Sequence, residues 1–190
     1  MDAARKSEAP AFGESQEYIA RRVTEALAGI APQVVQQTVE ILLRAPKIFV
    51  YGAGRSGIIG RAFAMRLVQV GLAAFVIGES TTPIVQAGDA VFILSGRGES
   101  QSSIQTANIV RREGAQLVVL TGRSTSKLAH AANLAIPLEF PDDAQQPELA
   151  PLGTLFESAS LQFTDALISA IMWARGESEE SMRRRHAIMV

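Results

Sequence analysis

The chain has 190 residues, the size of one domain, and 47% of them are apolar against 19% that are charged, so a sizeable core can form. Its 18 basic and 19 acidic residues leave a formal net charge of -1, which argues against a protein that binds the phosphate backbone of nucleic acids. The sequence has no cysteine and two histidines, so it excludes disulfides and thiolate sites and leaves little room for a histidine metal centre.

No apolar run approaches the ~20 residues of a membrane-spanning helix, and the first residues lack the apolar segment of a secretory signal. We interpret residues 1–15 as a flexible tail and residues 16–190 as a single domain of a soluble, cytoplasmic protein with no membrane partner. Two amphipathic helices are expected over residues 16–45, and Pro32 can open the second. Such a pair before the first strand is often a packing or oligomer surface.

From residue 47 onward, short apolar runs alternate with loops and helices. The expected strands cover residues 47–51, 73–77, 90–94, 116–120 and 134–138, and the helices between them cover 56–70, 100–112 and 125–131. Because the strand runs are apolar throughout, they are typical of a parallel sheet covered on both faces. The pattern predicts an α/β fold, a three-layer αβα sandwich with a five-stranded parallel sheet and an N-terminal helical pair.

The last third of the chain continues with a loop and two helices. Residues 140–151 are polar and proline-rich and are expected to form a loop. The helix expected over 155–174 is apolar nearly all round, so it must be buried on two sides, and we interpret the second side as a contact with a neighbouring subunit. A helix over 177–186 has its acidic residues early and its arginines late, which suits the helix dipole.

Three loops rich in glycine and hydroxyl side chains follow the first, third and fourth strands: GAGRSG at 52–57, SGRGES at 95–100 and TGRSTS at 121–126. Because the carboxyl ends of parallel strands lie at one edge of a sheet, their donors can converge there. Ser56 lies at a helix N-terminus, where backbone N–H groups favour a phosphate. The loops suit one phosphate and a polyhydroxylated body better than two nucleotides. The alternative is that the serines only cap helices.

The first loop also matches G-x-G-x-x-G, the pattern of a dinucleotide site. Glu79, two residues after the second expected strand, would then hold the ribose. That match is weak, since glycine-rich first turns occur in many α/β folds. A dinucleotide oxidoreductase also leaves the loop at 95–100 unexplained and lacks a second domain to carry substrate residues.

The GAGRSG and SGRGES loops within this α/β pattern resemble the sugar isomerase (SIS) domain family. Three further stretches, GESTTP at 78–83, GTLFE at 153–157 and RHA at 185–187, are together similar to its 6-phospho-3-hexuloisomerases from about residue 16 to the end. The resemblance implies a homotetramer that interconverts 3-hexulose 6-phosphate and fructose 6-phosphate in the ribulose monophosphate pathway. It implies no metal, no nucleotide and no other cofactor.

By this resemblance, Glu157 would be the acid/base on the sugar carbons, and His186 a second acid/base or a group that positions hydroxyls. Ser56, Ser95 and Ser100 would hold the phosphate. The full set of expected substrate-binding residues is Gly54, Arg55, Ser56, Glu79, Thr82, Ser95, Arg97 and Ser100.

Several of these residues have a second interpretation. The family loop usually reads SGSGET or SGSGTT, so Arg97 either adds a bidentate phosphate contact or points outward. Arg55, Glu79 and Thr82 either contact the substrate or are an exposed helix-start arginine and residues that fix a loop. Thr154-x-x-Glu157 is also a capping-box signature.

The two histidines are interpreted differently. His186 lies near the C-terminus, where a residue is usually on the surface, so a catalytic role needs the terminus to be tied down against a neighbouring subunit. His130 is taken as structural.

Moving a carbonyl from C3 to C2 requires that a proton leave C2 and one return to C3 through an enediol, which one carboxylate can do. The sequence therefore predicts a homo-oligomeric isomerase of a phosphorylated ketohexose that acts by proton transfer. The alternatives are an SIS isomerase of a pentose 5-phosphate and a non-catalytic sugar-phosphate-binding protein.

Overall fold

The computed structural model describes residues 12–188 and contains one parallel sheet. The strands lie in the order β2-β1-β3-β4-β5, and each expected strand is confirmed to within one residue at either end. Their bounds are β1 (Ile48–Gly52), β2 (Ala74–Val76), β3 (Ala90–Ser95), β4 (Gln116–Thr121) and β5 (Leu134–Pro137).

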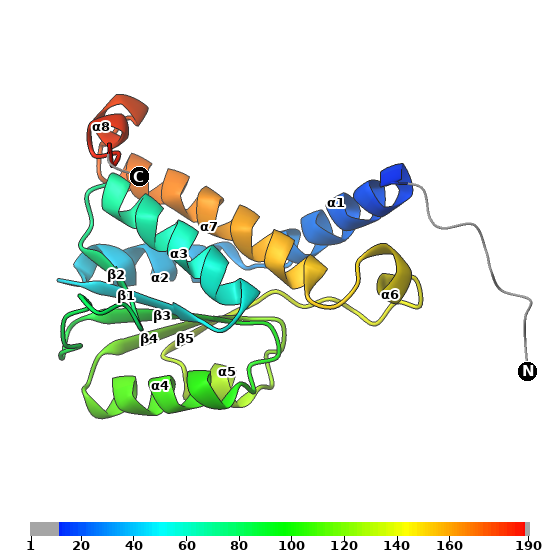
Figure 1. Ribbon diagram of the computed structural model, residues 1–190, viewed down its shortest axis with the longest axis horizontal. Helices are drawn as coiled ribbons and strands as arrows, with labels where there is room; N and C mark the ends of the chain where they lie inside the picture. The colour runs from blue at the N-terminus through cyan, green and yellow to red at the C-terminus, as the bar shows by residue number, and fades with distance from the viewer. Residues whose placement is uncertain (1–11, 189–190) are drawn as a thin grey trace, which may run out of the picture.

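Helices cover both faces of this sheet, which confirms the three-layer αβα sandwich (Figure 1). One face carries the N-terminal pair α1 (Phe12–Ala28) and α2 (Pro32–Arg44), together with α3 (Arg55–Gln69) and α7 (Thr154–Ala174). The other face carries α4 (Gln101–Arg112) and α5 (Lys127–Ala131). Two short helices, α6 (Gln146–Leu149) and α8 (Glu179–Arg184), lie beyond opposite ends of α7 (Figure 1).

Alternate residues of each inner strand face opposite layers, because side chains of a strand alternate with a period of two. In β4, Val118 and Leu120 pack in the core below α3 and α7, whereas Leu117 and Val119 pack against the layer of α4 and α5. All four are fully buried. Burial on both faces explains why this strand reads as a continuous apolar run in the sequence.

The strand order places a topological switch point between β1 and β3. The chain leaves β1 toward the neighbour on one side, β2, and returns to continue on the other side through β3, β4 and β5. The loops after β1 and β3 therefore run in opposite directions, and in open α/β sheets the crevice between such loops is where ligands bind.

The helices α1, α6 and α8 differ from the sequence-based expectations. Helix α1 begins at Phe12, so residues 12–15 of the expected tail are helical, and the rest of that tail lies outside the described residues. Helix α6 interrupts the expected loop over 140–151. It forms because Pro147 lies in its first turn, where a missing N–H costs nothing, and because Asp143 Oδ1 accepts a hydrogen bond from the backbone N–H of Gln145. Helix α8 is shorter than expected at both ends.

Helix α7 packs on α1, α2 and α3 with one continuous buried side. Its opposite side keeps two large apolar residues at the surface, Leu161 with 43% and Trp173 with 85% of its area exposed. Within one chain, α7 is thus buried on one side and not on the expected two. The contact of its other side with a neighbouring subunit stays a prediction. Among residues 12–188, no single helix has the length and apolarity to span a membrane; α1 and α2 reach that threshold only when joined across a 79° bend.

Candidate functional site

A cavity of about 900 Å³ opens at the carboxyl ends of β1, β3 and β4, beside the N-terminal end of α7. The three hydroxyl-rich loops do converge, since one side of the cavity, the loop wall, consists of residues that follow these strands. The loop wall comprises Ala53, Ser56, Leu94, Ser95, Gly96, Arg97, Glu99, Ser100, Gly122 and Arg123. The facing side, the α6–α7 wall, comprises Phe140, Gln146, Leu152, Gly153, Leu155, Phe156 and Glu157.

A tight turn after β1 brings the N-terminus of α3 to the cavity. A Cβ at Gly52 would lie 2.7 Å from the backbone carbon of Ser56, so only glycine allows the helix to start this close to the strand. Gly54 is the N-cap of α3, and its carbonyl accepts a hydrogen bond from the backbone N–H of Gly57 at 3.0 Å. The turn therefore places Ser56 in the loop wall, while Gly54 itself lies outside the lining residues.

The serine hydroxyls of the loop wall are not used as helix caps. Ser100 is the N-cap of α4 without a side-chain capping bond, and its Oγ lies 3.0 Å from Ser102 Oγ. Ser56 lies inside the first turn of α3, and Ser95 is buried at the end of β3. Capping is realised in the third loop, where Ser126 Oγ accepts a hydrogen bond from the backbone N–H of Ala129.

Two arginines leave the loop wall from adjacent positions. β3 and β4 pair with Ser95 opposite Thr121, and beyond the strands the backbone N–H of Gly122 donates to the carbonyl of Gly96 at 2.9 Å. Arg97 and Arg123 each follow directly on this bonded pair, and both line the cavity. The sequence-based prediction included Arg97 and missed Arg123; the register of the two loops is the signal that could have found it.

The charge of the loop wall is positive. Neither Arg97 nor Arg123 forms an ion pair with another residue between 12 and 188. The acidic residue of this wall, Glu99, forms an ion pair with Lys127, whose Nζ lies 3.3 Å from its Oε2. The backbone N–H of Lys127 also donates to Glu99 and lowers the pKa of that carboxyl below its usual value. Two guanidinium groups without an ion pair among the described residues make the wall suited to an anion.

Glu157 faces this wall from the first turn of α7, with 14% of its side chain exposed. Its Oε2 lies 2.9 Å from Nη2 of Arg55, although the N–H groups are not aligned for a hydrogen bond, and this buried oxygen accepts none from the described residues. The carboxylate lies over Gly153, where a Cβ would be 2.8 Å from Oε1.

The capping-box interpretation of Glu157 is not realised. The N-cap of α7 is Gly153 rather than Thr154, and it carries no side-chain capping bond. The Thr154 hydroxyl donates instead to the carbonyl of Pro151 at 2.7 Å. The Glu157 carboxylate is therefore held at the cavity by α7 and is not used to finish the helix.

His186 lies far from Glu157 in the same chain. The part of α7 from Glu157 to Ala174 spans about 25 Å at 1.5 Å per residue, and His186 follows α8, at the other end of that helix (Figure 1). Its ring is exposed, with Nδ1 2.9 Å from the carbonyl oxygen of Ala187. The expectation that both residues serve one site is not met within one chain, so a role for His186 at the cavity needs the histidine of a neighbouring subunit and stays a prediction.

The segment before His186 is tied down within the chain. Arg185 donates to Glu177 at 2.9 and 3.0 Å and to the carbonyl of Gln69 at the end of α3 at 3.2 Å. The hydrogen bonds from Arg185 and Ser181 lower the pKa of Glu177 to about 2. These contacts fix the direction in which the chain leaves α8.

Three further expected site residues are not among those that line the cavity. Arg55 pairs with Glu157 and has a largely exposed side chain. Glu79 forms an ion pair with Arg61 at 3.2 Å on the exposed surface, and Thr82 Oγ1 donates to the carbonyl of Val76 at 2.5 Å. Their contacts match the alternative interpretation, in which they fix the loop after β2. His130 behaves as a structural residue, since its Nδ1 lies 2.8 Å from the carbonyl of Ser126. Within residues 12–188, no three His, Asp or Glu side chains are grouped as they would be around a metal ion.

A model of the SIS domain family matches residues 41–164 of the chain. The chain belongs to the SIS domain family. This confirms the resemblance found in the loops after β1 and β3. The match covers all five strands and ends within α7, beyond Glu157.

The chain is also similar to proteins of nearly the same length within this family. The chain is 35% identical to a 3-hexulose-6-phosphate isomerase of Bacillus subtilis, over 92% of this chain and 98% of the relative. It is 32% identical to the protein of that name from Methylomonas aminofaciens, over 90% and 96%. A solved Methanococcus jannaschii structure, described as inferring a 3-hexulose-6-phosphate isomerase function, is 27% identical with a TM-score of 0.84 and covers 93% of this chain and 99% of that one.

Proposed function

We propose that the protein interconverts 3-hexulose 6-phosphate and fructose 6-phosphate by proton transfer through an enediol, without a cofactor. The observation that carries this proposal is a half-buried carboxylate, that of Glu157, facing across one cavity a wall with two arginines that form no ion pair among the described residues. This arrangement fits a ligand that has a phosphate group on one side of the cavity and a carbon that loses a proton on the other. The names of the full-length relatives support the same substrate pair.

The phosphate is assigned to the loop wall. Its donors are the hydroxyls of Ser56, Ser95 and Ser100 and the guanidinium groups of Arg97 and Arg123. The helices α3 and α4 begin in this wall, so the partial positive charge of their N-termini adds to that of the arginines. With its phosphate dianion bound here, the rest of the sugar would extend toward the α6–α7 wall.

The proton transfer is assigned to Glu157. Its carboxylate takes the proton from C2 of 3-hexulose 6-phosphate, and the electron pair of that C–H bond becomes the C2–C3 double bond of the enediol as O3 is protonated. The carboxylic acid then returns the proton to C3, while O2 loses its proton and becomes the carbonyl oxygen of fructose 6-phosphate. One carboxylate serves both carbons when they present the same face to it. Arg55, 2.9 Å away, holds the carboxylate toward the cavity.

The proton exchange between O2 and O3 is the step for which we propose His186 of a neighbouring subunit, because an imidazole ring can donate a proton from one nitrogen and accept one at the other. A homotetramer is the proposed assembly. It is supported by the apolar residues left exposed on two adjacent helices, Ile58, Met65 and Val68 of α3 and Leu161 and Trp173 of α7. We place the enzyme in the cytoplasm and in the ribulose monophosphate pathway, as the family resemblance implies.

The test is a coupled assay that follows fructose 6-phosphate formed from 3-hexulose 6-phosphate, run beside a pentose 5-phosphate ketose. We expect turnover of the hexulose phosphate, and a loss of about 10²- to 10⁴-fold in kcat in Glu157→Gln, the range of a general base. Asp165→Asn is the matched control, because Asp165 is an exposed acid two turns further along α7. Turnover of the pentose phosphate alone, or a Glu157→Gln variant as fast as Asp165→Asn, contradicts the proposal.

A further inference from the structure

The α6–α7 wall carries one polar side chain besides Glu157. Its seven lining residues are four apolar residues, Gly153, Glu157 and Gln146 of α6. An amide offers both hydrogen-bond donors and an acceptor, so it can bind a hydroxyl or a carbonyl group in either role. A sugar whose phosphate lies on the loop wall meets this amide as the one neutral hydrogen-bonding side chain that lines the α6–α7 wall.

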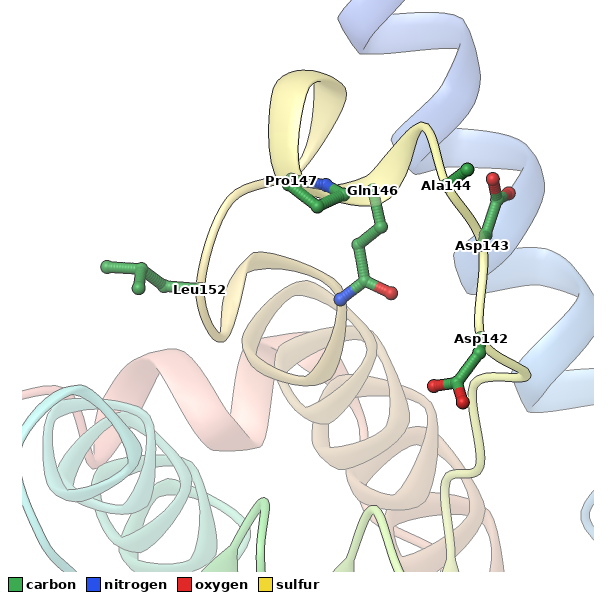
Figure 2. Close-up of a pocket in the computed structure, with 6 residues that line it drawn as sticks. All are labelled: Asp142, Asp143, Ala144, Gln146, Pro147 and Leu152. Atoms are coloured by element: carbon green, nitrogen blue, oxygen red, sulfur yellow. The ribbon is translucent and has the colours of Figure 1, made fainter.

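The Gln146 amide has no partner among the described residues: no hydrogen bond of its side chain is formed within residues 12–188. Figure 2 shows the side chain directed from α6 toward the N-terminal turn of α7, whereas Leu152 points away. The residue also borders a neighbouring cavity of about 530 Å³ that Asp142 and Asp143 line. It therefore stands at the boundary between the two cavities with its hydrogen-bonding capacity unused.

A buried polar cluster fixes the segment that carries this residue. Arg22 of α1 has only 5% of its area exposed and donates from Nη1 to Asp143 Oδ2 and from Nη2 to the carbonyl of Pro141, both at 2.6 Å. Its Nη1 also donates to the Tyr18 hydroxyl at 2.7 Å, and that hydroxyl donates to Asp143 Oδ2 at 3.0 Å. A buried arginine of this kind is costly unless fully paired, and removing one partner leaves the other uncompensated.

The cluster connects directly to α6. Asp143 Oδ1 accepts a hydrogen bond from the backbone N–H of Gln145 at 2.9 Å, and the carbonyl of Asp143 accepts one from the N–H of Gln146 at 3.1 Å. The hydrogen bond from the Gln145 N–H, followed by those from Tyr18 and Arg22, lowers the pKa of the Asp143 carboxyl. A helix of four residues is not stable by itself, so its position depends on such anchoring contacts.

We propose that Gln146 recognises a hydroxyl or carbonyl oxygen of the sugar, and that the cluster of Tyr18, Arg22 and Asp143 is the device that positions it. This inference rests on the proposed function, because it takes a phosphorylated sugar as the occupant of the cavity. Gln146 contacts the ligand, whereas the cluster acts through Gln146. The ligand chemistry is thus a polyhydroxylated chain that carries a phosphate at one end.

The direct test compares the binding of fructose 6-phosphate with that of inorganic phosphate by titration calorimetry. In Gln146→Ala we expect the Kd for fructose 6-phosphate to rise about tenfold, the loss of one hydrogen bond, and the Kd for inorganic phosphate to change less than twofold. Gln145→Ala is the matched control, since Gln145 is an exposed neighbour outside the lining residues. Equal Kd values for fructose 6-phosphate in the two variants overturn the assignment of Gln146.

The positioning role is tested with Asp143→Asn, measured alone and combined with Gln146→Ala. We expect Asp143→Asn to raise the Kd for fructose 6-phosphate selectively and to add less than twofold in the Gln146→Ala background. Lys47→Met is the control, because Lys47 pairs at 3.6 Å with the buried Asp89 just before β3, at the edge of the sheet away from the cavity. It should lower Tm without changing the ratio of the two Kd values. If Asp143→Asn also lowers Tm and leaves that ratio unchanged, the cluster only stabilises the fold.

The role of Gln146 and the proposed function can be refuted separately. The ratio of the two Kd values does not depend on a turnover assay, so it tests Gln146 even if the wild-type protein does not convert 3-hexulose 6-phosphate. Wild-type turnover together with a Gln146→Ala variant that keeps the wild-type Kd for fructose 6-phosphate overturns this inference and leaves the proposed function in place.

Discussion

Replacing Gly153 by alanine moves the proposed catalytic carboxylate while leaving the backbone unstrained. The added Cβ would lie 2.8 Å from Oε1 of Glu157, closer than the 3.0 Å that real Cβ contacts keep, so the carboxylate must move, and it reaches the 3.4 Å of ordinary contact after a shift of 0.6 Å. The other close atoms at this position, at 3.1 and 3.5 Å, belong to the same side chain. The backbone angles of Gly153, φ -88° and ψ 9°, are open to alanine.

A misplacement of about 1 Å at a reacting group costs roughly 10²-fold in rate. We therefore expect Gly153→Ala to lower kcat/KM for 3-hexulose 6-phosphate about tenfold in the coupled assay. Its Tm should stay within a few degrees of wild type, because the entropic gain of a Gly→Ala change offsets the loss of a glycine at an N-cap. Gly13→Ala is the control, since a Cβ at Gly13 meets no atom within 4 Å.

A double-mutant cycle decides whether the effect passes through Glu157. In a Glu157→Gln background the side chain no longer transfers protons, so its displacement should matter little, and Gly153→Ala should change the residual rate less than twofold. An equal loss in both backgrounds would mean that the alanine disturbs another part of the cavity. Wild-type kcat/KM in the single variant would mean that the position of the carboxylate is unimportant, and the acid/base assignment would be wrong.

Three more predictions concern the anion wall, the C-terminal segment and the choice of ligand. Arg123→Ala should weaken the binding of inorganic phosphate about tenfold and reduce the salt dependence of that binding, while Arg111→Ala on α4 should do neither. If calorimetry gives the two variants equal affinity for inorganic phosphate, the role of Arg123 is refuted. Because Arg185 lowers the pKa of Glu177 from 4.5 to about 2, the ionised carboxylate stabilises the fold above pH 4.5, and this contribution is lost as the pH falls toward 2. The Tm difference between wild type and Glu177→Gln should accordingly shrink between pH 6 and pH 2, and a constant difference in thermal melts contradicts the ion pair. Fructose 6-phosphate at 100 times its Kd should stabilise the protein by about 2.7 kcal/mol, whereas NAD should not raise Tm; the reverse result favours a dinucleotide site.

The sheet was predictable because its strands are covered on both faces. Such strands are apolar along most of their length, and the sequence of β3, AVFILS, and that of β4, QLVVLT, show this without knowledge of the fold. The loops that follow them converge because the strands are parallel, which also follows from the pattern. Ser56, Ser95, Arg97 and Ser100 were therefore found from the sequence, and all four line the cavity.

What the sequence could not predict depends on contacts between distant segments. Helix α6 lies in a polar, proline-rich stretch, and its stability comes from Arg22, more than a hundred residues earlier in the chain. His186 looked like a partner of Glu157 because both match family motifs, although the helix expected over 155–174 already separates them; which subunit would supply the histidine depends on contacts between chains, which the sequence does not show. Glu79 follows β2 as expected, yet the exposed Arg61 of α3 draws it away from the cavity.

The central claim, a proton transfer by Glu157, is tested most directly by hydrogen exchange at the sugar carbon. Fructose 6-phosphate is incubated with the enzyme in deuterated water, and deuterium at C3 is followed by NMR. The wild-type protein should introduce deuterium at C3 through the enediol, and Glu157→Gln should do so at least 10²-fold more slowly. Exchange at the wild-type rate in Glu157→Gln would contradict the assignment of this carboxylate.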